Sequence, residues 1–171
     1  EIKKLLNEKW QHNLHVAALS NVIARKFTSL NPEEALLGGL VHDIGALPIL
    51  EYSERVPELL DNPKLLDKLV MVLHTKVGHL ILRTWQFPAE LVKVASEHEK
   101  LDRDTGMEPD YTDVVLVANL LSHIGTDHPH TKKNWSEISA FDRLAISPEE
   151  CIEAIKDAKE EITEIQELFT V

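Results

Sequence analysis

The sequence predicts an all-α protein that folds as a compact helical bundle. Apolar residues recur at steps of three and four along several long segments, which is the spacing of one buried face of a helix. Asn-Pro or Ser-Pro precedes several of these segments, as is typical of helix starts. No segment alternates apolar and polar residues over the length of a strand, and the sequence contains no internal repeat.

The first two helices are predicted from a stripe and a start signal. Residues 2–27 should form one helix, because their apolar residues share one face. These residues are Leu5, Leu6, Trp10, Leu14, Ala17, Ala18, Val22 and Ile23. The run Asn31-Pro32-Glu33-Glu34 then predicts a second start, since Asn caps, Pro fits the first turn and the acids complement the helix dipole. We expect Gly45 to end or break this helix.

The remaining helices are predicted from prolines and capping residues at their boundaries. Pro48 and Pro57 should bracket short, irregular helical pieces, and a long helix is expected over residues 63–85. Its predicted buried stripe comprises Leu66, Leu69, Val70, Leu73, Val77, Leu80 and Ile81. Further helices are expected at 88–100 and from Pro109 to about residue 124, separated by a polar loop. After a loop at 125–134, Ser147-Pro148-Glu149-Glu150 predicts the start of a last helix that runs to about Phe169.

Composition excludes several classes of protein. The 171 residues suit a single domain over residues 1–171. The formal net charge of −11 disfavours a nucleic-acid partner, since such a surface repels phosphate backbones. No apolar run reaches the length of a membrane span, so no membrane partner is expected. The single Cys151 and the lack of a signal peptide predict a cytoplasmic location.

The adjacent pair His42-Asp43 is the strongest candidate for a functional site. An imidazole and a carboxylate on neighbouring residues can both reach one metal ion: His suits Zn, Fe and Ni, and carboxylate suits Mg, Mn and Fe. His12, His74 and His98 lie where helices could aim them inward, which predicts a divalent metal held by several helices. Asn119 occupies the natural position for a ligand from the fifth long helix, and an amide oxygen binds metal less tightly than a carboxylate. Surface or loop roles are expected for the other histidines, namely His15, His79, His123, His128 and His130.

These motifs resemble the HD superfamily of metal-dependent phosphohydrolases, and within it the HDOD domain, a non-catalytic relative of bacterial signalling proteins. The motifs cover most of the chain. They are Trp10-Gln11-His12, the run 38–45 that contains His42-Asp43, His74-Thr75-Lys76-Val77-Gly78, the run 82–88 that contains Trp85 and Pro88, Glu97-His98 and Val117-Ala118-Asn119. The resemblance implies a bundle of the HD-domain type, with a metal site formed by His12, His42, Asp43, His74, His98 and Asn119.

Two departures from the catalytic relatives affect the predicted function. In the active HD enzymes that this chain resembles, an Asp metal ligand stands at the position of Asn119. The related HD-GYP enzymes, which hydrolyse cyclic di-GMP, carry Lys where it has Ala46, and their Gly-x-Gly-Tyr-Pro run is reduced here to Gly106-Met107-Glu108-Pro109. Without the carboxylate, the metal ion that would generate hydroxide binds less tightly. Without the lysine, the site lacks a cation that could stabilise phosphoryl charge.

The resemblance therefore implies a regulatory signal-transduction module rather than an enzyme. The expected partner is a signalling protein or an N-terminal domain of the same protein, and a nucleotide is an expected small ligand. The alternative is a metal-dependent phosphohydrolase acting on a nucleotide or cyclic dinucleotide. Because residues 2–24 already read as mid-helix and HDOD domains usually carry a further N-terminal helical half, we expect this chain to correspond to the C-terminal, HD-like half.

Overall fold

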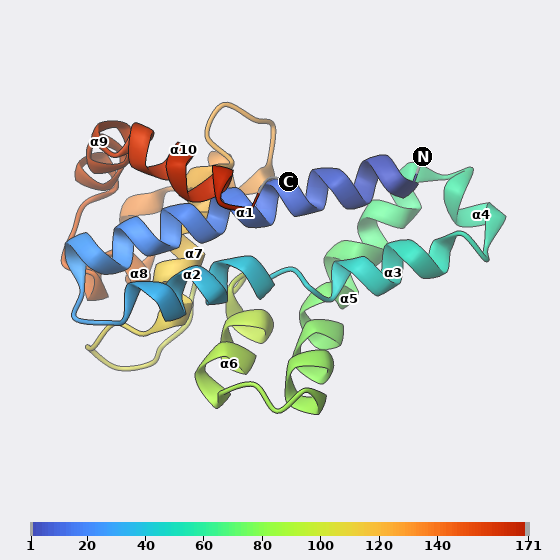
Figure 1. Ribbon diagram of the computed structural model, residues 1–171, viewed down its shortest axis with the longest axis horizontal. Coiled ribbons are helices and arrows are strands. Elements are labelled where there is room, and N and C mark those ends of the chain that lie inside the picture. Colours follow the sequence, from blue (N-terminus) through green and yellow to red (C-terminus); the bar gives the residue numbers. More distant parts are fainter. Residues whose placement is uncertain (1, 170–171) are drawn as a thin grey trace.

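The predicted all-α class is confirmed by the computed structural model, which describes residues 2–169 and contains helices but no strand in that range (Figure 1). The α-helices are α1 (Ile2–Phe27), α2 (Pro32–Val41), α3 (Ala46–Ser53), α4 (Pro57–Leu60), α5 (Pro63–Thr84), α6 (Ala89–Glu97), α7 (Tyr111–Ser122), α8 (Ser139–Arg143), α9 (Pro148–Asp157) and α10 (Lys159–Glu167). Two short 3-10 helices, η1 (Pro129–Lys132) and η2 (Trp135–Glu137), lie between α7 and α8.

Helix α1 runs along most of the molecule and joins its two ends (Figure 1). Helix α1 packs against α2, α7 and α10, and it also contacts α3. The stripe predicted for α1 is buried from Leu14 to Ile23, whereas Trp10 is 40% exposed and was wrongly assigned to it. The main apolar core surrounds α7, in which every residue from Tyr111 to Leu121 is buried.

Side-chain caps confirm most of the predicted helix starts. Asn31 accepts a hydrogen bond from the Glu33 backbone N–H at 2.8 Å, and Ser147 forms a capping box with Glu150. The predicted start of α7 at Pro109 is wrong. The helix begins two residues later because Asp110 caps it, in a capping box with Asp113.

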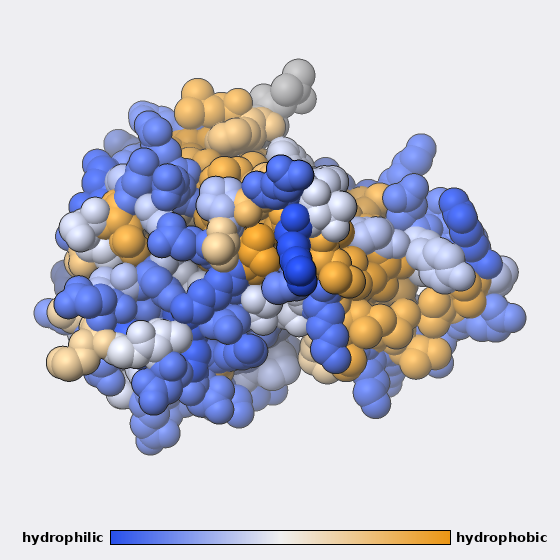
Figure 2. All heavy atoms as spheres, turned by 90° about the horizontal axis from the view of Figure 1, so that it is seen from below, coloured by the Kyte–Doolittle hydropathy of each residue, from blue (hydrophilic) through white to orange (hydrophobic). Residues whose placement is uncertain are grey.

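The buried stripe predicted for α5 is largely wrong. The buried face of α5 comprises Leu66, Val70, His74, Gly78 and Leu82. By contrast, Leu80 is 60% exposed, and Leu69, Leu73, Val77 and Ile81 are only half-buried. The helix thus carries two apolar faces, and Figure 2 shows apolar side chains gathered on the surface at the end formed by α3 and α5. Periodicity alone could not tell which face the rest of the chain covers.

The last part of the chain is more divided than predicted. The final helix is two helices, α9 and α10, with a break at Ala158. Helix α6 ends at Glu97 rather than near Lys100, so His98 is its C-cap. The predicted loop at 125–134 contains η1, and α8 was not predicted.

Two glycines allow the backbones of neighbouring helices to approach closely on either side of the predicted ligands His42 and Asp43. A Cβ on Gly39 would lie 2.6 Å from the Ala17 Cα, so a larger residue would push α2 away from α1. A Cβ on Gly45 would overlap the carbonyl oxygen of His74 on α5. The φ of Gly45 is −68°, so this glycine is needed for close packing and not to end a helix in a left-handed conformation.

We expect Gly39→Ala to lower the free energy of unfolding by about 2 kcal/mol, because the new methyl group meets backbone that cannot rotate away. The matched control is Gly38→Ala, whose Cβ would lie 3.4 Å from its nearest neighbours and which gains up to about 1 kcal/mol of helix propensity. Chemical denaturation of both variants measures the difference. Equal effects at the two positions would contradict the close-packing interpretation.

Candidate metal centre

Four separate elements deliver the predicted ligands to one place. His12 lies in the middle of α1, His42 and Asp43 form the turn after α2, His74 lies on α5, and His98 caps α6. His42, Asp43, His74 and His98 are each at most 6% exposed. Close packing at Gly39 and Gly45 lets the turn that carries His42 and Asp43 lie between α1 and α5.

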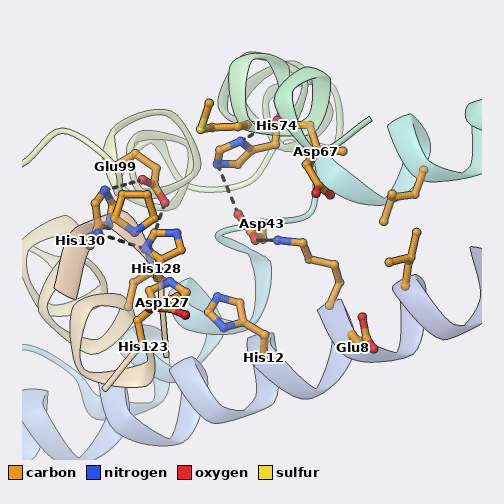
Figure 3. Close-up of a pocket in the computed structure, with 17 residues that line it drawn as sticks. Glu8, His12, Asp43, Asp67, His74, Glu99, His123, Asp127, His128 and His130 are labelled. Carbon is orange, nitrogen blue, oxygen red and sulfur yellow. Dashed lines mark hydrogen bonds and ion pairs between the residues drawn. The ribbon is translucent and has the colours of Figure 1, made fainter. Parts of the chain in front are cut away.

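The potential ligand atoms converge on Asp43, and Figure 3 shows His12 and His74 beside it. The Nε2 atoms of His74 and His98 each lie 3.4 Å from Asp43 Oδ1, and His42 Nε2 lies 3.9 Å from it. His12 Nε2 is 3.3 Å from His42 Nε2, and His74 Nε2 is 3.3 Å from His98 Nε2. Two groups able to hold a metal share Asp43: His12, His42 and Asp43, and then Asp43, His74 and His98.

Backbone carbonyls fix the tautomer of three of these imidazoles. The Nδ1 atoms of His42, His74 and His98 lie 2.6, 2.9 and 3.1 Å from the carbonyl oxygens of residues 39, 70 and 94. A carbonyl oxygen can only accept, so each Nδ1 donates its proton and each Nε2 of a neutral ring presents a lone pair to the cluster. Histidines that bind a metal through one ring nitrogen usually donate the other N–H to a carbonyl or carboxylate oxygen in this way.

The residues present fit a divalent transition metal. Two nitrogen lone pairs 3.3 Å apart repel each other unless a proton or a cation lies between them. Two nitrogens bound to one ion at about 2.1 Å lie roughly 3.0 to 3.4 Å apart, so this spacing suits neighbouring ligands of a single ion. Imidazoles with one carboxylate favour Zn, Fe, Mn or Ni over Mg.

Electrostatics also prepares the cluster for a cation. Burial alone would raise the pKa of Asp43, yet the surrounding imidazoles and the Lys9 ammonium lower that pKa well below its usual range. Burial lowers the pKa of His42 well below its usual value and that of His12 to about 4. Burial would likewise lower the pKa of His98, but the hydrogen bond and charge of Asp43 raise it instead. His12 and His42 are therefore neutral at neutral pH, as metal binding requires.

Asn119 lies at the cluster's edge, in the wall of the adjoining cavity. Its Nδ2 donates to Glu99 Oε1 at 3.2 Å, which directs Oδ1 away from that carboxylate. Oδ1 is buried and has no hydrogen-bond partner among the described atoms. An unpartnered buried amide oxygen is compatible with a weak ligand, and the role of Asn119 in the metal site stays a prediction.

A cavity of about 690 Å³ adjoins the cluster and contains residues that sequence reasoning missed. His123, His128 and His130 line it, although loop or surface roles were expected for them. The rings of His123 and His128 stack at 3.7 Å between centroids, and His130 Nε2 lies 3.2 Å from Glu99 Oε2 (Figure 3). His123 is the C-cap of α7 and follows Asn119 by four residues, so its face could have been predicted from its spacing.

The cavity lining also contains apolar side chains, those of Leu5, Leu50, Val70 and Met71. A ligand there would meet apolar surface and imidazoles as well as the potential metal ligands His12, Asp43 and His74.

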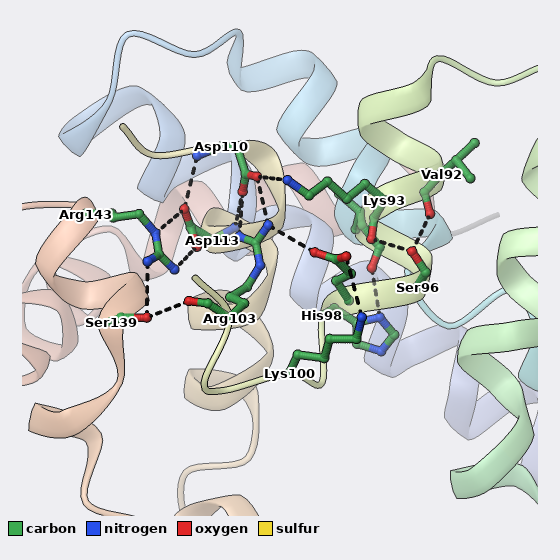
Figure 4. Close-up of polar contacts among 12 residues, drawn as sticks. Val92, Lys93, Ser96, His98, Lys100, Arg103, Asp110, Asp113, Ser139 and Arg143 are labelled. Atoms are coloured by element: carbon green, nitrogen blue, oxygen red, sulfur yellow. Dashed lines mark hydrogen bonds and ion pairs between the residues drawn. The ribbon is translucent and has the colours of Figure 1, made fainter. Parts of the chain in front are cut away.

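A buried ion network fixes the segment that carries His98 and Glu99 (Figure 4). Arg103 is 5% exposed and pairs with Glu97 at 3.3 Å, Asp110 at 2.7 Å and Asp113 at 2.6 Å. Arg143 on α8 also pairs with Asp113, at 2.8 Å. The network thereby ties the end of α6 to the start of α7, and so fixes His98 relative to Asn119.

The helices and the convergent ligands define a domain of the HD type with a candidate metal centre. The HDOD domain family matches residues 2–101, and the chain belongs to this family. The expected family is therefore confirmed.

Known proteins resemble this chain in sequence or in fold. Over 105 residues the chain is 33% identical to the cyclic-di-AMP phosphodiesterase PgpH of Bacillus subtilis, an alignment that covers 57% of this chain and 15% of PgpH. A crystal structure from Shewanella amazonensis, named as that of a metal-dependent phosphohydrolase, matches 95% of this chain and 60% of its own with a TM-score of 0.70 and 24% identity. A Geobacter sulfurreducens HDOD domain protein of unknown function matches 95% of this chain and 62% of its own with a TM-score of 0.71 and 18% identity. These two structures support the fold.

We expect the metal-free protein to lose stability as the pH falls from about 7 to about 5. Burial lowers the pKa of His12 to about 4 and that of His123 to about 3, while the unfolded chain protonates these rings near 6.5. Below about 6.5 the unfolded state binds more protons, so the free energy of unfolding decreases. His98 acts in the opposite sense, because its raised pKa gives stability that is lost as the pH rises through it.

Chemical denaturation of chelator-treated protein at several pH values measures this dependence. The variant His123→Gln should flatten the curve, and His79→Gln, on α5 outside the cluster, should leave it unchanged. A stability that rises on acidification would contradict the prediction.

We expect Arg103→Met to lower the free energy of unfolding by about 3 kcal/mol, because it removes the buried cation that the carboxylates of Glu97, Asp110 and Asp113 share and leaves Asp113 with Arg143 alone. Lys93→Met is the matched control, since Lys93 pairs with the same Asp110 at 2.9 Å but its side chain is 39% exposed. That variant should lose less than about 1 kcal/mol. Thermal and chemical denaturation compare the two, and similar losses would argue against a special role for Arg103.

Proposed function

We propose that this chain is a metal-binding regulatory module, which holds a divalent first-row metal ion and binds a small ligand or a protein partner without efficient turnover. The carrying observation is the convergence of His42, His74 and His98 on Asp43 with their Nε2 lone pairs inward. Such a set would bind metal with little reorganisation. His12 lies beside His42 and adds a further imidazole to this set of ligands.

Four features of the site favour regulation over hydrolysis. Asn119 offers a neutral amide at the position where the active HD enzymes have a carboxylate. Ala46 is apolar and fully buried, whereas the HD-GYP enzymes have a lysine at this position. The second oxygen of Asp43 already pairs with Lys9 at 2.9 Å. The cavity is also acidic, with Glu8, Asp43, Asp67, Glu99 and Asp127 in its wall. Acidic walls disfavour a phosphate ester unless metal is bound.

A metal-dependent phosphohydrolase is the second candidate function. The cavity beside the cluster favours it, because it has room for a small ligand next to the metal ligands. The similarity to PgpH suggests a cyclic dinucleotide or another nucleotide as its substrate. A bound divalent ion would supply an activated water and neutralise phosphoryl charge there, while the apolar side chains and the imidazoles of the lining would bind the rest of the substrate.

The partner and the location are part of the proposal. The expected partner remains a signalling protein or another domain of the same protein, in a bacterial cytoplasm. No helix in the described range is both long and apolar enough to cross a bilayer.

Elemental analysis of the freshly purified protein tests the proposed function. We expect about one Fe, Mn, Ni or Zn ion per chain and turnover of nucleotides and cyclic dinucleotides well below about 1 s⁻¹ with added metal. The double variant His42→Ala/Asp43→Ala should lose the metal, because it removes Asp43, which both ligand groups share, and also His42 of the first group. His79→Ala, on the same helix as His74 but outside the cluster, should keep it.

The two candidate functions predict different results. Metal together with rapid hydrolysis that the double variant abolishes would establish the phosphohydrolase. Metal without hydrolysis supports the regulatory module. A chain that neither retains nor takes up metal would contradict both.

A further inference from the structure

Lys9 forms an ion pair with the carboxylate of the candidate metal centre. Its Nζ lies 2.9 Å from Asp43 Oδ2, whereas the other oxygen, Oδ1, faces the Nε2 atoms of His42, His74 and His98. The two oxygens of one carboxylate thus have different partners. One faces the potential metal ligands and the other is held by an ammonium group.

Lys9 reaches this position from α1, one turn before His12. Residues three apart share a face of a helix, so the same face supplies a metal ligand and a fixed cation. The side chain of Lys9 is 35% exposed, while that of Asp43 is 8% exposed. The ammonium can therefore leave for solvent by rotation of its flexible stem, whereas the carboxylate cannot.

The charge of the cavity makes this ammonium important. Five carboxylates line the cavity, those of Glu8, Asp43, Asp67, Glu99 and Asp127. Among the described residues in that lining, Lys9 is the one lysine or arginine. A buried carboxylate is costly without a positive partner, and Lys9 supplies a cation on the Oδ2 side of Asp43 when no ion is bound.

We propose that Lys9 is an exchangeable counter-ion of the metal centre: it neutralises Asp43 in the metal-free protein and is displaced when a divalent ion binds. This inference rests on the proposed metal binding. A divalent ion repels the ammonium and competes with it for the same carboxylate, so binding of the ion and the contact between Lys9 and Asp43 oppose each other. Lys9 thereby weakens metal binding and stabilises the metal-free fold, which suits reversible occupancy.

Metal affinity of Lys9 variants tests the proposal. Titration of chelator-treated protein with Mn²⁺ or Zn²⁺ alone should show that Lys9→Met binds at least about tenfold more tightly than the wild type. Lys9→Arg, which keeps the charge and can hold the carboxylate with two hydrogen bonds, should bind no more tightly than the wild type. Lys4→Met is the matched control on the same helix, because Lys4 is 80% exposed and pairs only with Glu8 among the described residues.

Thermal denaturation gives a second readout that requires no activity. Metal-free Lys9→Met should melt below the wild type, because Asp43 loses its partner, and the metal-bound forms should melt at similar temperatures. Metal should therefore stabilise Lys9→Met more than the wild type. If Lys9→Met does not fold without metal but folds when metal is added, the proposal is supported as well.

The outcomes separate this inference from the proposed function. If the wild type binds metal and Lys9→Met binds it no more tightly, Lys9 is not an exchangeable counter-ion, and the metal-binding proposal stands. If Lys9→Met binds metal and the wild type does not, the counter-ion is confirmed and the wild type is not a metal-binding module under these conditions. If neither binds, both proposals fail.

Discussion

The buried carboxylate of Asp43 is the constraint around which the rest of the site is arranged. It is 6% exposed and lies among four imidazoles, so its charge must be balanced within the protein. The backbone bonds of His42, His74 and His98 direct each Nε2 inward, and Lys9 covers the other side. A pocket prepared in this way for positive charge is costly as a purely structural element, which is why metal binding explains it better than packing does.

Close backbone packing makes this arrangement attainable. The turn that carries His42 and Asp43 can reach the middle of the molecule because Gly39 lies against α1 and Gly45 lies against α5. A side chain at either glycine would separate the helices that carry His12 and His74. The Arg103 network performs a comparable task for His98, since it ties the residue before His98 to the start of α7. Glycine contacts and ion pairs thus determine the ligand geometry together.

Local signals in the sequence predicted much of the fold, and contacts between distant segments account for the errors. Asn31 and Ser147 mark helix starts through their own side chains, so they could be recognised without tertiary structure. The exposed apolar face of α5 was misassigned because the pattern does not say which face has a partner. His128 and His130 could not be placed either. Their positions depend on the stacking of His128 on His123 at the end of α7 and on Trp135 Nε1, which donates to the His130 carbonyl at 2.9 Å.

The position of the cluster between separate apolar regions gives a physical reason for regulation by metal. One apolar core surrounds α7, and a second, smaller one includes Ile2, Leu50 and Val70 at the other end of the molecule. His74 and Asp43 lie between the two, where contacts are polar. An ion held there would add bonds between α1, α5 and the end of α6 at the level of the polar cluster. Metal binding would therefore stiffen the junction between the two cores, and a partner that contacts both ends would sense whether the ion is present.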